Sequence, residues 1–216
     1  MLFCTDVDLL HWEPNIFRDA AFASQLLLAG TADLAGTTLT VAAGSLADAH
    51  VSAGQVVHLS GTIEGSYPII SVDGPAQLTL SVLYDGLYGE PAGEASPVGS
   101  ANGVNFAIRT FWPQRRVVSG LLLRAAGIGP ETGAPASAAI LNMEALRRPC
   151  VLGTLQMIYS ALAAAAEEPA PLNVRAELYQ RLYRRSLEQT VLQLDFNGDG
   201  RADTMRRLNV VRLVRC

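Results

Sequence analysis

The acidic stretch Asp195–Asp203, with the sequence DFNGDGRAD, carries the side chains best suited to binding chemistry. Oxygen-bearing side chains recur there at Asp195, Asn197, Asp199 and Asp203, and Arg201 could add its backbone carbonyl. Calcium binds about six to eight oxygen ligands, and a loop supplies them from alternating positions with a glycine at the sharp turn. Gly200 stands at that turn. The spacing predicts a structural calcium-type site and no open catalytic centre.

The end of this stretch departs from an EF-hand, because Arg206 occupies the place of the bidentate glutamate. Over nine residues the stretch resembles more closely the DxNxDGxxD loops of integrin-type repeats. A second interpretation stays open. The NGDG sequence also favours a tight turn by itself, since Asn, Asp and Gly tolerate left-handed backbone conformations. Arginines at 201, 206 and 207 could then neutralise the carboxylates without a metal.

Charge is unevenly distributed along the chain. Residues 1–108 hold one arginine and eleven acidic residues, a net charge of −10, whereas residues 109–216 hold fifteen arginines and nine acidic residues, a net charge of +6. Such an asymmetry suggests organised contacts with other macromolecules, or two substructures whose surfaces differ without consequence. The overall charge of −4 argues against binding through phosphates, which needs a strongly positive surface.

The sequence contains no GxSxG, HExxH or Walker motif, and we predict that the protein is not an enzyme. None of the three histidines has an acid or nucleophile close in sequence, and we interpret His58 as a hydrogen-bonded or surface residue of a strand. Cys4, Cys150 and Cys216 are far apart and odd in number, which predicts reduced thiols rather than a disulfide framework or a zinc site.

The N-terminus has no basic region typical of a signal peptide, and no apolar run reaches the roughly 18 residues that cross a bilayer. We therefore expect synthesis in the cytoplasm and no membrane partner. Thr5 is the predicted N-cap of a short helix that ends before Pro14.

Short runs rich in β-branched residues predict a compact antiparallel meander or small barrel; they are Gln55–Leu59, Tyr67–Val72 and Gln77–Leu83. Helical patterns follow. One begins near Pro113 and ends with Gly127 as its C′ residue, one opens at Pro149, and one follows Asn173 and runs to Leu194. A half-exposed strand is expected from Arg206 to Arg215.

These patterns predict an α+β fold, in which a small helical bundle carries an inserted antiparallel β module and a C-terminal strand. The expected divisions are an N-terminal segment packed on the helical domain (1–35), the inserted β module (36–84), an irregular loop (85–103) and a helical domain ending in the acidic loop and strand (104–216).

The helical part resembles head–tail connector (neck adaptor) proteins of tailed bacteriophages, over roughly residues 104–204. The segments that carry the resemblance are FWPQRRVVSGLLLRAAGI, VLGTLQMIYSAL and RAELYQRLYRRSLEQTVLQLDFNGDG. Such adaptors pair a helical bundle with β extensions and end a long helix in an acidic segment.

The resemblance implies a non-enzymatic virion protein, made in the host cytoplasm, that forms a homo-oligomeric ring, expected to be a dodecamer. Its partners would be the portal protein on one side and a neck or tail protein on the other, with DNA only passing through the channel. The alternative is a calcium-stabilised binding module or another structural component of the tail. Ca²⁺ is the only cofactor that the sequence suggests.

Overall fold

The computed structural model describes residues 1–83, 95–128 and 139–208. The chain divides into two compact units. We call Thr5–Phe111 the barrel unit, and Met1–Cys4 together with Trp112–Cys216 the helical unit. Among the described residues, no helix combines the length and the apolar character that crossing a membrane requires.

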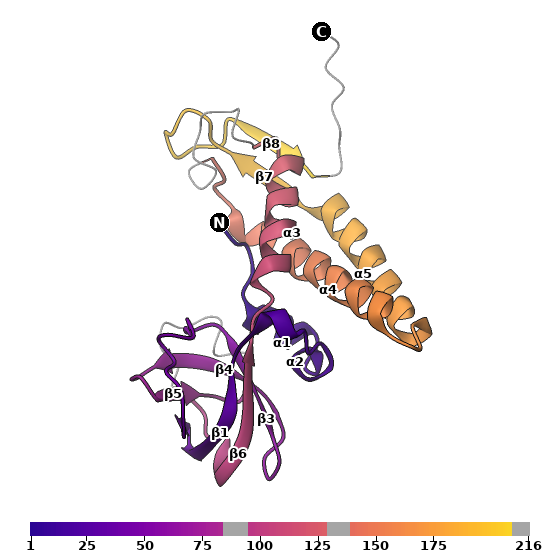
Figure 1. The fold of residues 1–216 in the computed structure, drawn as a ribbon. Helices are drawn as coiled ribbons and strands as arrows, with labels where there is room; N and C mark the ends of the chain where they lie inside the picture. Colours follow the sequence, from indigo (N-terminus) through magenta and orange to yellow (C-terminus); the bar gives the residue numbers. More distant parts are fainter. Residues whose placement is uncertain (84–94, 129–138, 209–216) are drawn as a thin grey trace. The chain divides into compact units, whose positions relative to one another are not determined.

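Six antiparallel strands of the barrel unit close into a barrel in the order β1-β2-β5-β4-β3-β6 (Figure 1). The strands are β1 (Leu26–Gly36), β2 (Thr38–Val41), β3 (Val56–Ser60), β4 (Gly65–Val72), β5 (Gln77–Leu80) and β6 (Gly99–Arg109). The long ladder between β1 and β6 joins the two ends of the sheet. Closure removes the unpaired edges through which open sheets associate.

Alternation of apolar and polar residues explains the barrel core. In β2, Leu39 and Val41 are buried while Thr40 is exposed. Leu59, Leu78 and Leu80 contribute fully buried side chains from the neighbouring strands. Burial of apolar surface is the main stabilising contribution in such a core, about 25 cal/mol per Å².

Two short helices belong to the barrel unit, α1 (Asp6–Trp12) and α2 (Ile16–Asp19). The predicted N-cap at Thr5 is confirmed: Thr5 Oγ1 accepts from the amide of Asp8 (3.2 Å), and the Asp8 carboxylate accepts from the amide of Thr5 (2.7 Å). Fully buried Asp6 accepts hydrogen bonds from the Thr110 hydroxyl (2.7 Å) and the Phe111 amide (3.0 Å). These bonds tie α1 to the end of the last barrel strand.

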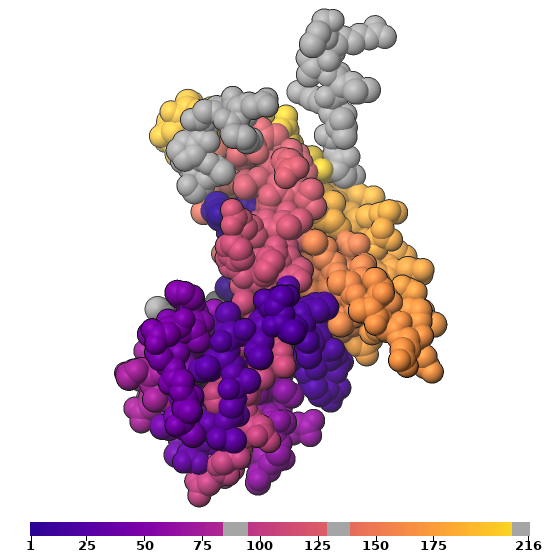
Figure 2. All heavy atoms as spheres, viewed as in Figure 1, coloured from indigo at the N-terminus to yellow at the C-terminus, as the bar shows by residue number. Residues whose placement is uncertain are grey.

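The helical unit contains α3 (Trp112–Ala125), the short 3₁₀ helix η4 (Met143–Leu146), α4 (Arg147–Ala165), α5 (Ala170–Gln189), and the strands β7 (Val191–Leu194) and β8 (Thr204–Arg207). Figure 2 shows α4 and α5 packed along each other with α3 against them. Gly127 ends α3 as predicted: its φ is 71°, and the following amide, of Ile128, donates to the Leu123 carbonyl (2.9 Å).

Close approach of the three helices occurs at Gly153 of α4. A Cβ atom there would lie 2.9 Å from Cγ1 of Val118 on α3 and 3.1 Å from Cε2 of Tyr183 on α5. Further along the same helix pair, the rings of Tyr159 and Tyr179 stack with centroids 5.5 Å apart. A glycine and stacked rings therefore set the spacing of α4 and α5.

The predicted fold class is wrong, because the β structure is a closed barrel and not a module inserted into a helical bundle. The expected module, residues 36–84, contains β2 to β5, but β1 and β6 complete the barrel from outside it. β1 gives little strand signal, since alanine and glycine dilute its alternation. β6 begins at Gly99, inside the stretch expected to be a loop, whose residues 85–94 lie outside the described residues.

The third predicted helix is also too long. α5 ends at Gln189, and Val191–Leu194 forms β7 instead of a last helical turn. Leu192 and Leu194 are fully buried there, and strand pairing with β8 satisfies the backbone of this segment. β8 covers only the beginning of the expected final strand, and residues 209–216 lie outside the described residues.

Candidate functional site

The acidic loop connects β7 to β8 in an antiparallel hairpin, in which Val191 pairs with Arg207 and Leu194 with Thr204. The prediction placed this loop directly between the long helix and the final strand, which is wrong because β7 intervenes. The amide of Asp203 donates to the Leu194 carbonyl (2.9 Å), so the hairpin register closes the loop.

Asp195 organises the first half of the loop. Its Oδ1 accepts from the amide of Gly198 (2.6 Å) and its Oδ2 from the amide of Gly200 (2.8 Å). Both glycines have a φ of 79°, a left-handed conformation that side chains disfavour. Burial opposes ionisation of this carboxyl, which is only 4% exposed, but the amides of Gly200 and Gly198 outweigh it and lower the pKa of Asp195.

The second half of the loop is held by Asp203 and Asn197. Asp203 Oδ2 accepts from the amides of Phe196 (2.7 Å) and Asn197 (3.2 Å), and its Oδ1 accepts from the side-chain amide of Asn197 (2.9 Å). Asn197 Oδ1 accepts from the Asp199 amide (2.9 Å), and Asp199 Oδ1 accepts from the Arg201 amide (2.8 Å). Hydrogen bonds thus link Asn197, Asp199, Arg201 and Asp203 to one another, while Asp195 binds the glycine amides of the same loop.

This network has a direct bearing on the predicted calcium site. In the part of the chain that the structure describes, no three His, Cys, Asp or Glu residues form a group that could hold a metal ion. The carboxylates are stabilised by backbone amides, as the metal-free turn requires. A carboxylate nevertheless offers about four lone pairs, so the observed hydrogen bonds leave acceptor capacity for a cation. Calcium binding remains a prediction.

Arg206 has a role that sequence reasoning missed. Its Nη1 donates to the carbonyl of Ala126 (2.6 Å), just beyond the last residue of α3. Carbonyl groups at a helix C-terminus lack intrahelical partners and attract cationic donors. Arg206 therefore ties the hairpin to the end of α3. The sequence does show that a helix ends near Gly127 and that arginines follow in the expected final strand. It does not show that they meet, because Arg206 and Ala126 are 80 positions apart.

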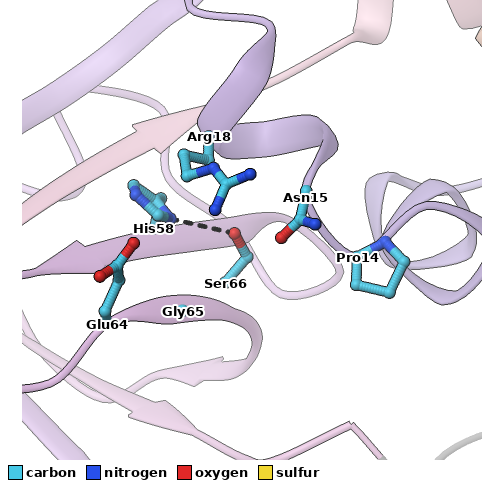
Figure 3. A pocket seen from close by; sticks show the side chains of 7 residues that line it. All are labelled: Pro14, Asn15, Arg18, His58, Glu64, Gly65 and Ser66. Atoms are coloured by element: carbon cyan, nitrogen blue, oxygen red, sulfur yellow. Dashed lines mark hydrogen bonds between the residues drawn. The ribbon is translucent and has the colours of Figure 1, made fainter.

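A polar pocket of about 390 Å³ lies in the barrel unit (Figure 3). Its lining residues are Pro14, Asn15, Arg18, His58, Glu64, Gly65 and Ser66. The Glu64 carboxylate and the Ser66 hydroxyl lie beside the His58 ring, and Arg18 of α2 extends into the same pocket from above them in this view. No sequence pattern indicates this pocket, because its residues come from segments that meet only in the folded barrel.

His58 and Ser66 lie opposite each other on β3 and β4, and His58 Nδ1 is 3.1 Å from Ser66 Oγ. The interpretation of His58 as a hydrogen-bonded residue is confirmed. Burial, and then the charge of Arg109, lower the pKa of His58 below its usual value. The neutral imidazole is therefore favoured, and its contact with Ser66 positions two polar side chains on the outer face of the barrel.

The two units carry net charges of opposite sign. The barrel unit holds two arginines and eleven acidic residues, a net charge of −9, and the helical unit holds fourteen arginines and nine acidic residues, a net charge of +5. The uneven charge along the sequence thus becomes a difference between two compact bodies.

The helical unit also exposes large apolar side chains. On α3, Val117 and Leu121 are 50% and 45% exposed, and on α5, Val174 and Leu178 are 64% and 43% exposed. Each pair is spaced four residues apart, so its members lie on one helix face. Each pair adds exposed apolar surface to its helix, and contiguous apolar patches larger than a few hundred Å² mark contacts with other proteins.

Comparisons with protein-family models, curated proteins and solved structures found no match.

Proposed function

We propose that the protein is a structural component of a tailed-bacteriophage neck, which assembles into a homo-oligomeric ring between portal and tail and leaves a channel for DNA. The observation that carries the proposal is the opposite net charge of the two units, −9 and +5. A ring is built from heterologous interfaces, in which one surface of a subunit meets a different surface of the next. A subunit with one acidic and one basic unit offers two such complementary surfaces.

The resemblance of residues 104–204 to neck adaptors supports the same assignment, and the exposed apolar pairs of α3 and α5 provide contact area. Individual exposed ion pairs contribute only about 0–1 kcal/mol. The electrostatic contribution therefore depends on many pairs repeated around the ring. The portal protein, a tail-side protein and passing DNA are the proposed partners, and the virion is the proposed location.

The test is the mass of the purified chain in solution, measured by light scattering and checked by electron microscopy. We expect a ring at about 0.01 M salt and its dissociation toward about 1 M, because the Debye length falls from about 30 Å to about 3 Å. Such proteins can also assemble only on the portal, so the same measurement is repeated with portal particles present.

Charge variants of α5 sharpen the test. Arg181 and Arg184 are exposed, and their double change to Glu should abolish assembly. The matched change of both to Lys keeps the charge and should preserve it. Assembly of the Glu variant, or a ring whose formation is indifferent to salt, contradicts the electrostatic argument. Absence of the chain from purified phage particles contradicts the virion assignment.

The hydrogen-bonded acidic loop favours a second candidate, a calcium-stabilised binding module or another tail component. A chain that stays monomeric with and without portal particles, yet is stabilised by calcium, supports this candidate over the ring.

A further inference from the structure

Two cysteines that are 146 positions apart in the sequence meet inside the helical unit. Cys4 Sγ lies 2.7 Å from Cys150 Sγ, and the two side chains are 4% and 0% exposed. Both residues are thiols in the structure. A disulfide bond is about 2.05 Å long, so the sulfur atoms need to approach by less than about 1 Å more.

The surroundings hold the two sulfur atoms in place. The backbone amide of Phe3 donates to the Ser119 hydroxyl (3.3 Å), and Arg115 Nη1 donates to the Cys4 carbonyl (3.0 Å). These bonds fix the N-terminal segment against α3. Ser119 Oγ is also 3.5 Å from Cys150 Sγ. The N-terminal segment also buries the side chain of Phe3, which is only 8% exposed.

We propose that Cys4 and Cys150 are a covalent modification site, at which a low-molecular-weight disulfide oxidises the two thiols to an intramolecular disulfide. The odd number of cysteines and their wide separation in the sequence predict reduced thiols. In the folded chain, however, Cys4 and Cys150 are in contact, so their separation in the sequence does not prevent a disulfide bond. The inference does not depend on the proposed neck function.

The local chemistry favours Cys150 as the attacking thiolate. The hydrogen bond with Cys4 lowers the pKa of Cys150, and the Ser119 hydroxyl and the Arg115 charge act in the same direction, while burial opposes them. The thiolate is the reactive form in exchange with disulfides. Since both sulfurs are buried in the native chain, the exchange takes place during folding, before the N-terminal segment covers Cys150. At that stage Cys4 is not yet in contact, and Ser119 and Arg115 of α3 are the groups that favour the Cys150 thiolate.

The reaction balances in two steps. The Cys150 thiolate attacks one sulfur of the small disulfide RSSR, which forms Cys150–S–SR and releases RS⁻, and RS⁻ takes up the proton that Cys150 lost. The Cys4 thiolate then attacks the Cys150 sulfur and expels the second RS⁻, which takes up the proton of Cys4. Two protein thiols lose two electrons and two protons, and one small disulfide becomes two small thiols.

The bond would close a loop that contains the whole barrel unit, Thr5–Phe111. A cross-link that spans a long loop stabilises the native state, in the chain-entropy model, by restricting the unfolded chain. A chain that folds in a reducing cytoplasm would keep the thiols, and a chain that folds or refolds in an oxidising medium would gain the bond.

The test uses a Cys216→Ser background, in which only the Cys4 and Cys150 thiols remain. The protein is refolded with oxidised and reduced glutathione, or with reductant alone, and then denatured and alkylated. We expect no alkylated cysteine and a mass loss of two hydrogens in the oxidised sample, and two alkylated cysteines in the reduced one. The melting temperature should be about 5–15 °C higher in the oxidised sample.

The matched control is Cys4→Ser in the same background, whose melting temperature should not respond to glutathione. Two free thiols after oxidation, accumulation of a glutathione adduct on Cys150, or disulfide-linked dimers would overturn the proposal. If Cys4→Ser fails to fold, the mass and melting temperature of the parent in its two redox states still decide the question.

Discussion

Replacing Gly153 by alanine tests the packing of the three helices. The added methyl would meet Val118 at 2.9 Å and the Tyr183 ring at 3.1 and 3.3 Å. Real Cβ atoms do not approach other atoms as closely as 2.9 Å. Val118 is 2% exposed and β-branched, so its side chain has little freedom to move away.

Two effects of opposite sign set the magnitude. Alanine is favoured over glycine inside a helix by about 1 kcal/mol. Overpacking a well-filled site costs about 1–3 kcal/mol. We therefore expect Gly153→Ala to lower the free energy of unfolding by up to about 2 kcal/mol.

Gly120 of α3 provides the matched control, because a Cβ added there meets no atom within 4 Å. Gly120→Ala should raise the free energy of unfolding by about 0.5–1 kcal/mol. Helix propensity is common to both changes, so the difference between the variants isolates the packing effect, about 1–3 kcal/mol.

The assay is urea unfolding followed by far-ultraviolet circular dichroism, at a salt concentration where light scattering shows a monomer. Equal slopes of free energy against urea for the variants allow the midpoints to be compared directly. Equal stability of Gly153→Ala and Gly120→Ala would show that the three helices do not approach one another as closely as these distances indicate.

Two further predictions concern the acidic loop and the pocket. Calcium should raise the melting temperature relative to a sample with chelator, because binding at a hundredfold excess over Kd stabilises the folded state by about 2.7 kcal/mol. Asp199→Ala should remove most of this gain. Identical melting curves with calcium and with chelator would leave only the metal-free turn. The lowered pKa of His58 means that the unfolded chain binds the proton first as the pH falls through about 6.5, so the free energy of unfolding should decrease below that pH. Urea unfolding at about pH 7.5 and about pH 5.5 should show a smaller decrease for His58→Gln, and an equal decrease in both proteins contradicts a depressed pKa.

The acidic loop was predictable because its hydrogen bonds are local. Asp195 to Gly200, Asn197 to Asp199 and Asp199 to Arg201 all connect residues within five positions. Turn chemistry of this range depends on residue type and backbone conformation alone. Whether a cation joins the loop depends on how many oxygens remain directed at one point, which spacing does not decide.

The N-cap at Thr5, the C′ glycine at Gly127 and the three strands predicted at Gln55–Leu59, Tyr67–Val72 and Gln77–Leu83 were determined by the sequence itself, although the last strand ends at Leu80. Each depends on a few neighbouring residues, through capping, left-handed backbone or alternation. The pocket around His58 could not be predicted, because α2 and the β3–β4 ladder meet only after folding.

Tertiary structure decided the contacts between distant positions. The pairing of β1 with β6 closes the barrel, Arg206 reaches Ala126, and Cys4 meets Cys150. No local pattern encodes such partners, because many alanine-rich strands, arginines and cysteines would look the same in the sequence. The partner is selected by which arrangement buries the apolar faces of all elements together and satisfies their backbone groups, and that is a property of the whole chain.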